Sequence, residues 1–129
     1  MAPSLTIAVK RIHEPAGPDD GARFLVDRLW PRGVSKEKAA LAAWLKPLAP
    51  SDRLRKQFHG ETAASDVAWD MFRRDYFAEL DAGGEEVKTA LFTLDAAARA
   101  GPVTLLYAAK DEKRNNAVAL REWLERGSL

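Results

Sequence analysis

Three short apolar runs, separated by segments with helical periodicity, constrain the fold of this chain more than any other feature. Residues 5–12 (LTIAVKRI), 23–29 (RFLVDRL) and 103–109 (VTLLYAA) are rich in strand-forming residues. Near-continuous apolar strands are typical of sheets that are covered on both faces. Strands joined through helices need crossover connections, which favour parallel pairing. The sequence therefore predicts an α/β fold, with a mainly parallel sheet and helices packed around it.

Helical periodicity fills most of the remaining chain. Trp69, Phe72 and Tyr76 recur at spacings of three and four residues, so they share one face of a helix. We interpret this aromatic stripe as part of the core, with ligand binding as the alternative. The expected helices cover residues 36–44 after the N-cap Ser35, about 51–58 from Ser51 or Asp52, 66–82 and 85–100, with a last helix carrying Ala117, Leu120 and Leu124.

Length and composition predict one domain. A chain of 129 residues, 47% of them hydrophobic, is long enough for one hydrophobic core but short for two. We therefore expect a single small α/β domain over residues 1–129. No apolar stretch approaches the roughly 20 residues that span a bilayer, and the N-terminus lacks a basic segment followed by a long apolar one. These features predict a cytoplasmic location without membrane association.

The residue inventory excludes several chemistries. The chain has no cysteine, which removes disulfides, thiolate metal ligands and cysteine nucleophiles. His13 and His59 are its two histidines. A metal site made of Asp27, His59 and Asp111 is an alternative without a diagnostic ligand spacing, so no metal is expected. His59 itself is interpreted as a capping or surface residue rather than a catalyst.

Charge is polarised along the chain although the net charge is only +1. Residues 1–58 carry 11 basic and 6 acidic groups, whereas residues 59–129 carry 9 basic and 13 acidic groups. This distribution suits a local anion site in the first half better than broad binding to duplex DNA. A nucleic-acid-binding regulator is therefore an alternative that the sequence disfavours, because no helix-turn-helix with a basic recognition helix is apparent.

Charged residues stand where each expected strand ends. The three ends are Lys10-Arg11, Asp27-Arg28 and Lys110-Asp111. Ligands of open parallel sheets collect at the carboxyl ends of the strands. Arginine presents a planar fork of donors that suits phosphate or carboxylate, and a tryptophan ring can stack on a flat ligand. The sequence therefore predicts a site for a small anionic molecule, phosphorylated or nucleoside-type, at this edge.

Each candidate residue has an expected role at that edge. Asp27 and Arg28 are the catalytic candidates, with Asp27 as an acid or base whose ionised form the arginines favour. Arg28 and Arg32 are also the expected anion donors, and Arg32 should line a concave pocket between Pro31 and Gly33. The ligand-binding candidates are Lys10, Arg11, Trp30, Arg32, Lys110, Asp111, Asn115 and Asn116. The pattern specifies neither a reaction, a cofactor nor an oligomeric state.

A structural interpretation of the same residues stands beside this one. Asp27 and Arg28 could form an internal ion pair that closes the top of the sheet, with Trp30 as a lid on the core. Asn115 and Asn116 could be N-cap residues of the last helix and nothing more. Neither interpretation is excluded by the sequence.

Three stretches resemble a known family over nearly the whole chain. DRLWPRG, LAPS followed by LR, and LLYAAKD followed by NNA occur together and in order, as in the YeaO-like branch of the domain-of-unknown-function family 488. The resemblance implies a small α/β domain of bacterial or archaeal type, without an established activity. It places the family's shared positions on Lys10, Arg11, Asp27, Arg28, Trp30, Pro31, Arg32, Gly33, Ala49, Pro50, Ser51, Tyr76, Asn115 and Asn116.

The chain departs from related domains at two places. A wider set of these domains carries a Cys-His-Arg stretch after the last strand, where this chain has residues 113–116 (KRNN). The resemblance therefore brings no thiol chemistry to this protein. Residues 59–68 (HGETAASDVA) also differ from the family's short histidine-containing turn, so no family role is carried over to His59.

Overall fold

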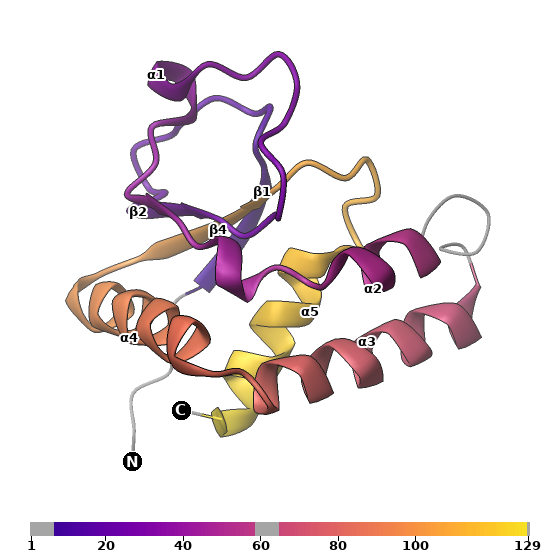
Figure 1. Ribbon diagram of the computed structural model, residues 1–129. Helices are drawn as coiled ribbons and strands as arrows, with labels where there is room; N and C mark the ends of the chain where they lie inside the picture. The colour runs from indigo at the N-terminus through magenta and orange to yellow at the C-terminus, as the bar shows by residue number, and fades with distance from the viewer. Residues whose placement is uncertain (1–6, 59–64, 129) are drawn as a thin grey trace.

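Four strands form one parallel sheet in the computed structural model, which describes residues 7–58 and 65–128. The strand order is β1-β4-β2-β3, and every neighbouring pair is parallel. The strands are β1 (Ile7–Arg11), β2 (Ala22–Leu25), β3 (Ala43–Trp44) and β4 (Val103–Tyr107). β4 lies between β1 and β2, and Figure 1 shows α3, α4 and α5 on one side of the sheet with α1 on the other. The predicted α/β class with a parallel sheet is confirmed.

Two of the strands are shorter than the sequence suggests. The expected strand 23–29 included Asp27 and Arg28. β2 ends at Leu25 instead, so both residues follow the strand. β4 likewise ends at Tyr107 rather than at residue 109. Both strands therefore end before the charged residues that follow them.

The expected helix over residues 36–44 is wrong in its second half. Helix α1 spans only Lys36–Ala39, and Ala40 ends it in the left-handed region at φ 48°. The chain then turns into β3, where the Ala42 amide donates to Arg23 O and the Leu45 amide donates to Leu25 O, both at 2.8 Å. Pairing with β2 therefore overrides the helical propensity of an alanine-rich stretch.

The remaining helices lie close to their expected positions. They are α2 (Asp52–Gln57), α3 (Asp66–Asp81), α4 (Glu85–Ala100) and α5 (Asn116–Trp123), with a short 3₁₀ turn η1 (Lys46–Leu48) and a final π turn η3 (Leu124–Ser128). Serine side chains cap two of the expected starts, because Ser35 Oγ accepts from the Lys38 amide and Ser51 Oγ accepts from the Leu54 amide.

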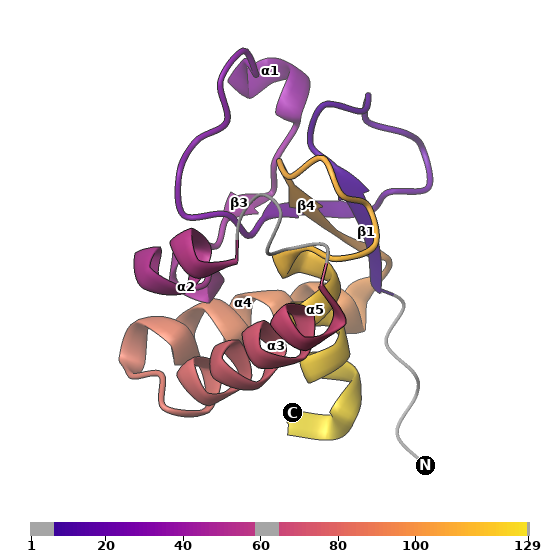
Figure 2. The same cartoon turned by 90° about the vertical axis from the view of Figure 1, so that its right-hand side faces the viewer.

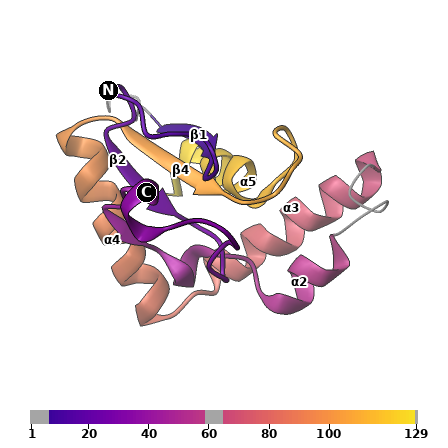
Figure 3. The same cartoon turned by 90° about the horizontal axis from the view of Figure 1, so that it is seen from above.

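The two faces of the sheet are covered differently. Phe24 and Leu105 face the main core with the helices, whereas Leu25 and Leu106 face a smaller cluster on the opposite side. Figure 2 shows α3, α4 and α5 below the strands and the loops with α1 above them. Seen from the loop side, α5 lies behind the strands, with α4 and α3 to either side (Figure 3). We call these the helix-covered face and the loop-covered face.

The aromatic stripe on α3 belongs to the main core. Phe72 and Tyr76 are buried, and Trp69 packs partly buried against them. Phe58 from the end of α2 stacks on Phe72, with ring centroids 4.6 Å apart. The Tyr76 hydroxyl donates to the main-chain carbonyl of Leu48, and burial raises the pKa of Tyr76. The interpretation of this stripe as core is confirmed.

Candidate functional site

The carboxyl ends of β2 and β4 meet at Asp27. The Val26 amide donates to Leu106 O at 3.1 Å, which extends the pairing of the two strands by one residue. Asp27 Oδ2 then accepts from the Ala108 amide at 3.0 Å. The predicted parallel arrangement, which brings the end of β2 beside the end of β4, is confirmed.

Asn116, at the start of α5, holds the other oxygen of this carboxyl. Its Nδ2 donates at 2.9 Å both to Asp27 Oδ1 and to the main-chain carbonyl of Val26. Burial raises the pKa of Asp27, and the bonds from Asn116 and Ala108, together with the charge of Arg55, oppose that rise. Asp27 is therefore a half-buried carboxyl whose contacts are neutral donors, with cationic side chains farther out.

Arg28 turns away from Asp27. Its Nε donates to the main-chain carbonyl of Pro50 at 3.3 Å and lies 3.8 Å from the carboxylate of Asp52. No ion pair joins Asp27 and Arg28 within the described residues, so the internal pair that the sequence allowed is wrong. Consecutive side chains of an extended chain point in opposite directions, which separates the two groups.

Trp30 packs as a lid over the loop-covered face of the sheet. Its indole Nε1 donates to Val34 O at 2.8 Å, and its ring packs against the apolar cluster of the loop-covered face. The same ring meets that of Trp44 edge-on, with centroids 5.6 Å apart. Trp44 in turn donates from Nε1 to Asp27 O at 2.6 Å, a contact that sequence reasoning missed because Trp44 was assigned to a helix.

Arg32 does not line an enclosed pocket. Its side chain is exposed, and it makes no hydrogen bond or ion pair within residues 7–58 and 65–128. The expectation of a concave arginine pocket is wrong, because the Arg32 side chain lies in solvent. Arg32 remains a surface cation on the loop that follows Asp27.

Arg11 joins the edge, whereas Lys10 does not. Arg11 Nε donates to Ala108 O at 3.5 Å, one peptide away from the amide that holds Asp27. Lys10 points to the loop-covered face, where its Nζ lies 3.1 Å from the carboxylate of Asp20. The alternation of side chains along β1 places these neighbours on opposite faces.

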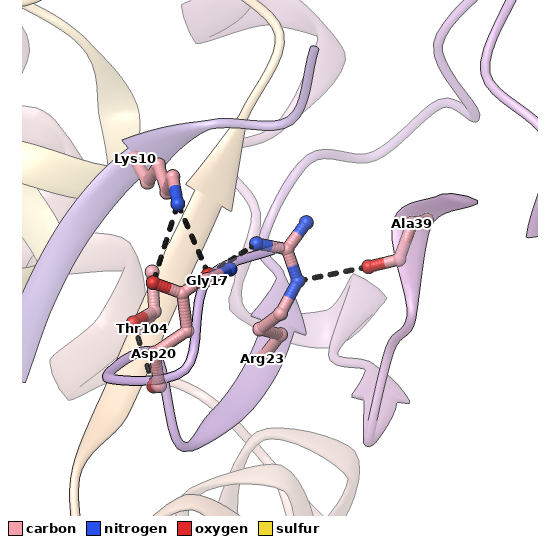
Figure 4. A network of polar contacts seen from close by, with 6 residues as sticks. All are labelled: Lys10, Gly17, Asp20, Arg23, Ala39 and Thr104. Carbon is pink, nitrogen blue, oxygen red and sulfur yellow. Dashed lines mark hydrogen bonds and ion pairs between the residues drawn. The ribbon is translucent and has the colours of Figure 1, made fainter. Parts of the chain in front are cut away.

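A polar network that sequence reasoning missed surrounds Asp20 (Figure 4). Asp20 Oδ2 accepts from the Gly17 amide at 2.9 Å and from Arg23 Nη1 at 2.7 Å, in addition to Lys10. Thr104 Oγ1 donates to Asp20 O at 2.8 Å. The Gly17 amide, with Arg23 and Lys10, lowers the pKa of Asp20 against the opposing effect of burial.

Arg23 in this network connects two loops to the sheet. Only 3% of it is exposed, and its Nε donates to the Ala39 carbonyl at 2.9 Å. Its Nη2 is buried and has no acceptor among the described residues. An arginine inside an apolar strand is the sequence signal that could have identified this clamp, because a buried guanidinium requires partners.

The polar residues after β4 build the turn that starts α5. Asp111 Oδ1 accepts from the amides of Lys113 and Arg114 at 2.9 and 3.0 Å, and these bonds lower the pKa of Asp111. Asn115, which is 2% exposed, caps α5 by accepting from the Val118 amide at 2.9 Å. The N-cap interpretation is confirmed for Asn115 and wrong for Asn116. Lys110 is exposed.

The edge therefore consists of a central carboxyl and several guanidinium groups. Arg11 and Arg28 are each anchored through Nε to a main-chain carbonyl, and their terminal nitrogens have no hydrogen bond within the described residues. Arg55 on α2 is 45% exposed in its side chain and contacts Asp52 at 3.5 Å. Guanidinium nitrogens held in this way can donate to phosphate or carboxylate oxygens.

Two further tests concern metals and membranes. Among the described residues, no group of three histidine, aspartate or glutamate side chains could hold a metal ion. His59 lies outside the described residues, and with it the metal alternative that included it. Within the same ranges, no helix has both the length and the apolar character that crossing a bilayer requires.

The fold and this edge define a small α/β domain with a polar edge at the carboxyl ends of a parallel sheet. The family model described as "Inactive DUF488-N3 subclade" matches residues 6–128. The chain belongs to this family, which confirms the resemblance to the domain-of-unknown-function family 488.

Individual relatives agree with that assignment. The chain is 45% identical over 120 residues to the "Uncharacterized protein YeaO" of Escherichia coli, covering 93% of this chain and 97% of the relative. It is 32% identical over 124 residues to the "Uncharacterized protein Rv3073c" of Mycobacterium tuberculosis, covering 96% and 98%. No solved structure is significantly similar to the chain.

Proposed function

We propose that this chain is a cytoplasmic, non-catalytic domain that binds a small phosphorylated or nucleoside-type anion at the carboxyl edge of the sheet. The observation that carries the proposal is the pair Arg11 and Arg28. Each guanidinium is oriented by a bond from Nε to a main-chain carbonyl, which leaves its two terminal nitrogens for a ligand. Such anchoring reduces the conformational entropy that an arginine loses on binding.

Asp27 supports the site as a scaffold in this proposal. Both of its oxygens accept hydrogen bonds, from the Ala108 amide and from Asn116. These bonds connect β2, β4 and α5, and so fix the backbone from which Arg28 extends. The ligand's charge is met by Arg11 and Arg28, with Arg32, Arg55 and Lys110 as exposed cations around them.

A non-catalytic role agrees with the family description, which carries the word "Inactive". An enzyme that uses Asp27 as a base is the second candidate, because burial raises the pKa of this carboxyl toward the working range of a base. Turnover separates the two candidates. Phosphate release from AMP or ribose 5-phosphate that is lost in Asp27→Asn would favour the enzyme.

Ligand binding is tested by calorimetry and thermal shift with inorganic phosphate, pyrophosphate, AMP and ribose 5-phosphate. A ligand of the native state raises the melting temperature by an amount that grows with the logarithm of its concentration relative to its Kd. We expect Arg28→Gln and Arg11→Gln each to weaken binding about tenfold or more, since each removes a charge-assisted donor pair.

Arg99→Gln is the matched control for charge. Arg99 lies on α4, is 72% exposed and pairs with Asp95 of its own helix, so its loss should leave binding unchanged. If all three arginine variants bound the anion equally weakly, the loss of net charge alone would explain the effect. No binding of any of the four compounds at millimolar concentration would contradict the proposal.

A further inference from the structure

A groove separates the end of β3 from helix α4, and Trp44 in its lining adjoins the arginine-bearing edge through its bond to Asp27 O. The groove has a volume of about 400 Å³ and is lined on one side by Trp44, Leu45 and Pro47. On the other side stand residues of the first turns of α4, among them Glu85, Glu86, Thr89 and Thr93. Leu45 and Ala90 in its lining are only 5% and 6% exposed. The groove thus has an apolar floor and a polar rim.

The strand beside this groove is an edge strand. β3 is the last strand in the order and pairs with β2 alone among the described residues. Its main-chain bonds from Ala42 and Leu45 both go to β2. An edge strand is a template on which another extended chain can align. The groove therefore runs beside a backbone that can receive an extended segment.

The rim of the groove carries negative charge. Glu85 has only a long contact of 3.9 Å with Lys88, and its side chain is 91% exposed. Glu86 is exposed and makes no ion pair within residues 7–58 and 65–128. On the facing wall, the ammonium group of Lys46 already lies 5.4 Å from the ring centroid of Trp44. The rim on α4 therefore attracts cations, whereas the wall at Trp44 already carries the positive charge of Lys46.

An exposed aromatic side chain extends this surface. Phe92 is 76% exposed, and its spacing from Glu85 and Thr89 places it on the same stripe of α4. A phenylalanine so exposed is available for a contact outside the chain, in contrast to the buried Phe72. Apolar contacts can therefore continue beyond the groove along α4.

We propose that this groove is the docking site for an extended segment of a partner protein in which basic and apolar residues alternate. Alternation follows from strand geometry, because successive side chains of an extended chain point to opposite sides. Apolar side chains of the segment face Leu45 and Ala90, and basic side chains face Glu85 and Glu86. The acidic rim disfavours the anionic ligands expected at the arginine-bearing edge, so the two proposals concern different ligands.

The probe is an acetylated and amidated seven-residue peptide of alternating lysine and valine, titrated into isotopically labelled protein and followed by NMR. We expect saturable shifts of the amides of Thr89 and Thr93 and of the Trp44 indole. The double variant Glu85→Gln/Glu86→Gln should weaken binding at least tenfold. Both positions are exposed, so this variant should keep its fold.

Two controls make the outcome specific. The double variant Glu37→Gln/Glu125→Gln removes the same charge at exposed positions elsewhere and should bind as the native protein does. Arg28→Gln should also bind the peptide normally, so failure at this groove is distinct from failure at the anion site. A matching peptide of alternating glutamate and valine should not bind.

Several results would overturn the proposal. These are equal binding of the acidic peptide, equal weakening in the two glutamate double variants, and no saturable shift at millimolar peptide. If the groove amides shift with protein concentration alone, the occupant is a second copy of this chain instead of a partner segment.

Discussion

Asp20 and Asp27 flank the same strand, β2, yet their carboxyl groups have opposite pKa shifts. Asp20 accepts from the Gly17 amide and also contacts two cations, Arg23 and Lys10, and its pKa is lowered. Asp27 is held by neutral donors, Asn116 and the Ala108 amide, and its pKa is raised because burial outweighs them. The comparison shows that burial decides the sign of the shift, because neutral donors contact both carboxyls and desolvation outweighs the donors only at Asp27.

The two aspartates also differ in what they connect. Asp20, through Arg23, fastens the loops of the loop-covered face to the sheet. Asp27 fastens β2 to β4 and α5 at the edge where we propose ligand binding. We therefore expect Asp20 to matter mainly for stability, and Asp27 to matter for both stability and the arrangement of Arg28.

The largest expected effect is that of Asp20→Asn. This change leaves the buried guanidinium of Arg23 without its counter-charge, and one-sided disruption of a buried pair typically costs about 3–5 kcal/mol. Denaturant unfolding at neutral pH measures the loss. The double variant Asp20→Asn/Arg23→Met should lose less than the sum of its single changes, because the buried charge is then removed as well. If the double variant lost as much stability as the two single variants together, Asp20 and Arg23 would not be coupled.

Asp27→Asn should have a smaller effect, about 1–3 kcal/mol. The asparagine nitrogen must face a donor, either the Ala108 amide or Asn116, so one hydrogen bond is lost. Removal of a buried charge offsets part of that cost. The same denaturant measurement tests this, and a loss as large as that of Asp20→Asn would break the distinction between the two regions. Binding of the four anionic probes to this variant reports whether Arg28 keeps its position.

Asn115→Ala should cost about 1 kcal/mol, the typical value for removal of an N-cap. Asn115 Oδ1 accepts from the Val118 amide, and its Nδ2 donates to Asp111 O. Thermal unfolding measures the change, and Ser35→Ala serves as a comparison, because that cap belongs to the four-residue helix α1. The Ser35 variant should lose less. If Asn115→Ala abolished anion binding without loss of stability, Asn115 would belong to the site and not to the scaffold.

The smallest expected effect concerns the dependence of stability on pH. The lowered pKa of Asp20 stabilises the fold above its unfolded value of about 4, and this contribution is lost as pH falls through the folded pKa. The raised pKa of Asp27 has the opposite sign. Its folded state binds the proton more tightly, so stability gains as pH falls from the folded pKa to about 4. Asp27→Asn should remove the gain in stability as pH falls to about 4. Asp20→Asn should remove the loss of stability at lower pH. Unfolding curves measured across this pH range test both.

Much of the fold follows from local sequence patterns. Apolar runs predict β1, β2 and β4, and the caps Ser51 and Asn115 were expected from residues beside the helices they start. What local patterns could not predict depends on partners far along the chain. Ala40 adopts a left-handed conformation, and the chain then turns to pair β3 with β2. An alanine-rich stretch contains no local signal for that turn.

The sequence predicted which strand ends meet at this edge, but not the contacts that their side chains make. Parallel strands bring their ends to one edge, so Asp27 and Ala108 could be expected near each other. Whether Asp27 pairs with Arg28 or with Asn116 depends on the direction of each side chain, which the sequence does not specify. The predicted site residues all stand at strand ends or in the segments that follow them, and therefore do not include Arg23. Arg23 lies within β2 and binds the Ala39 carbonyl from there.

The most direct measurement is a carbon NMR titration of the aspartate carboxyl groups in the native protein. We expect a pKa for Asp27 above 3.8, the ordinary aspartate value, and a pKa for Asp20 below it. Saturating inorganic phosphate should raise the pKa of Asp27 further, since a bound anion disfavours its ionised form, and should leave Asp20 unchanged. An Asp27 pKa below that of Asp20, or a phosphate effect on Asp20 alone, would contradict the account.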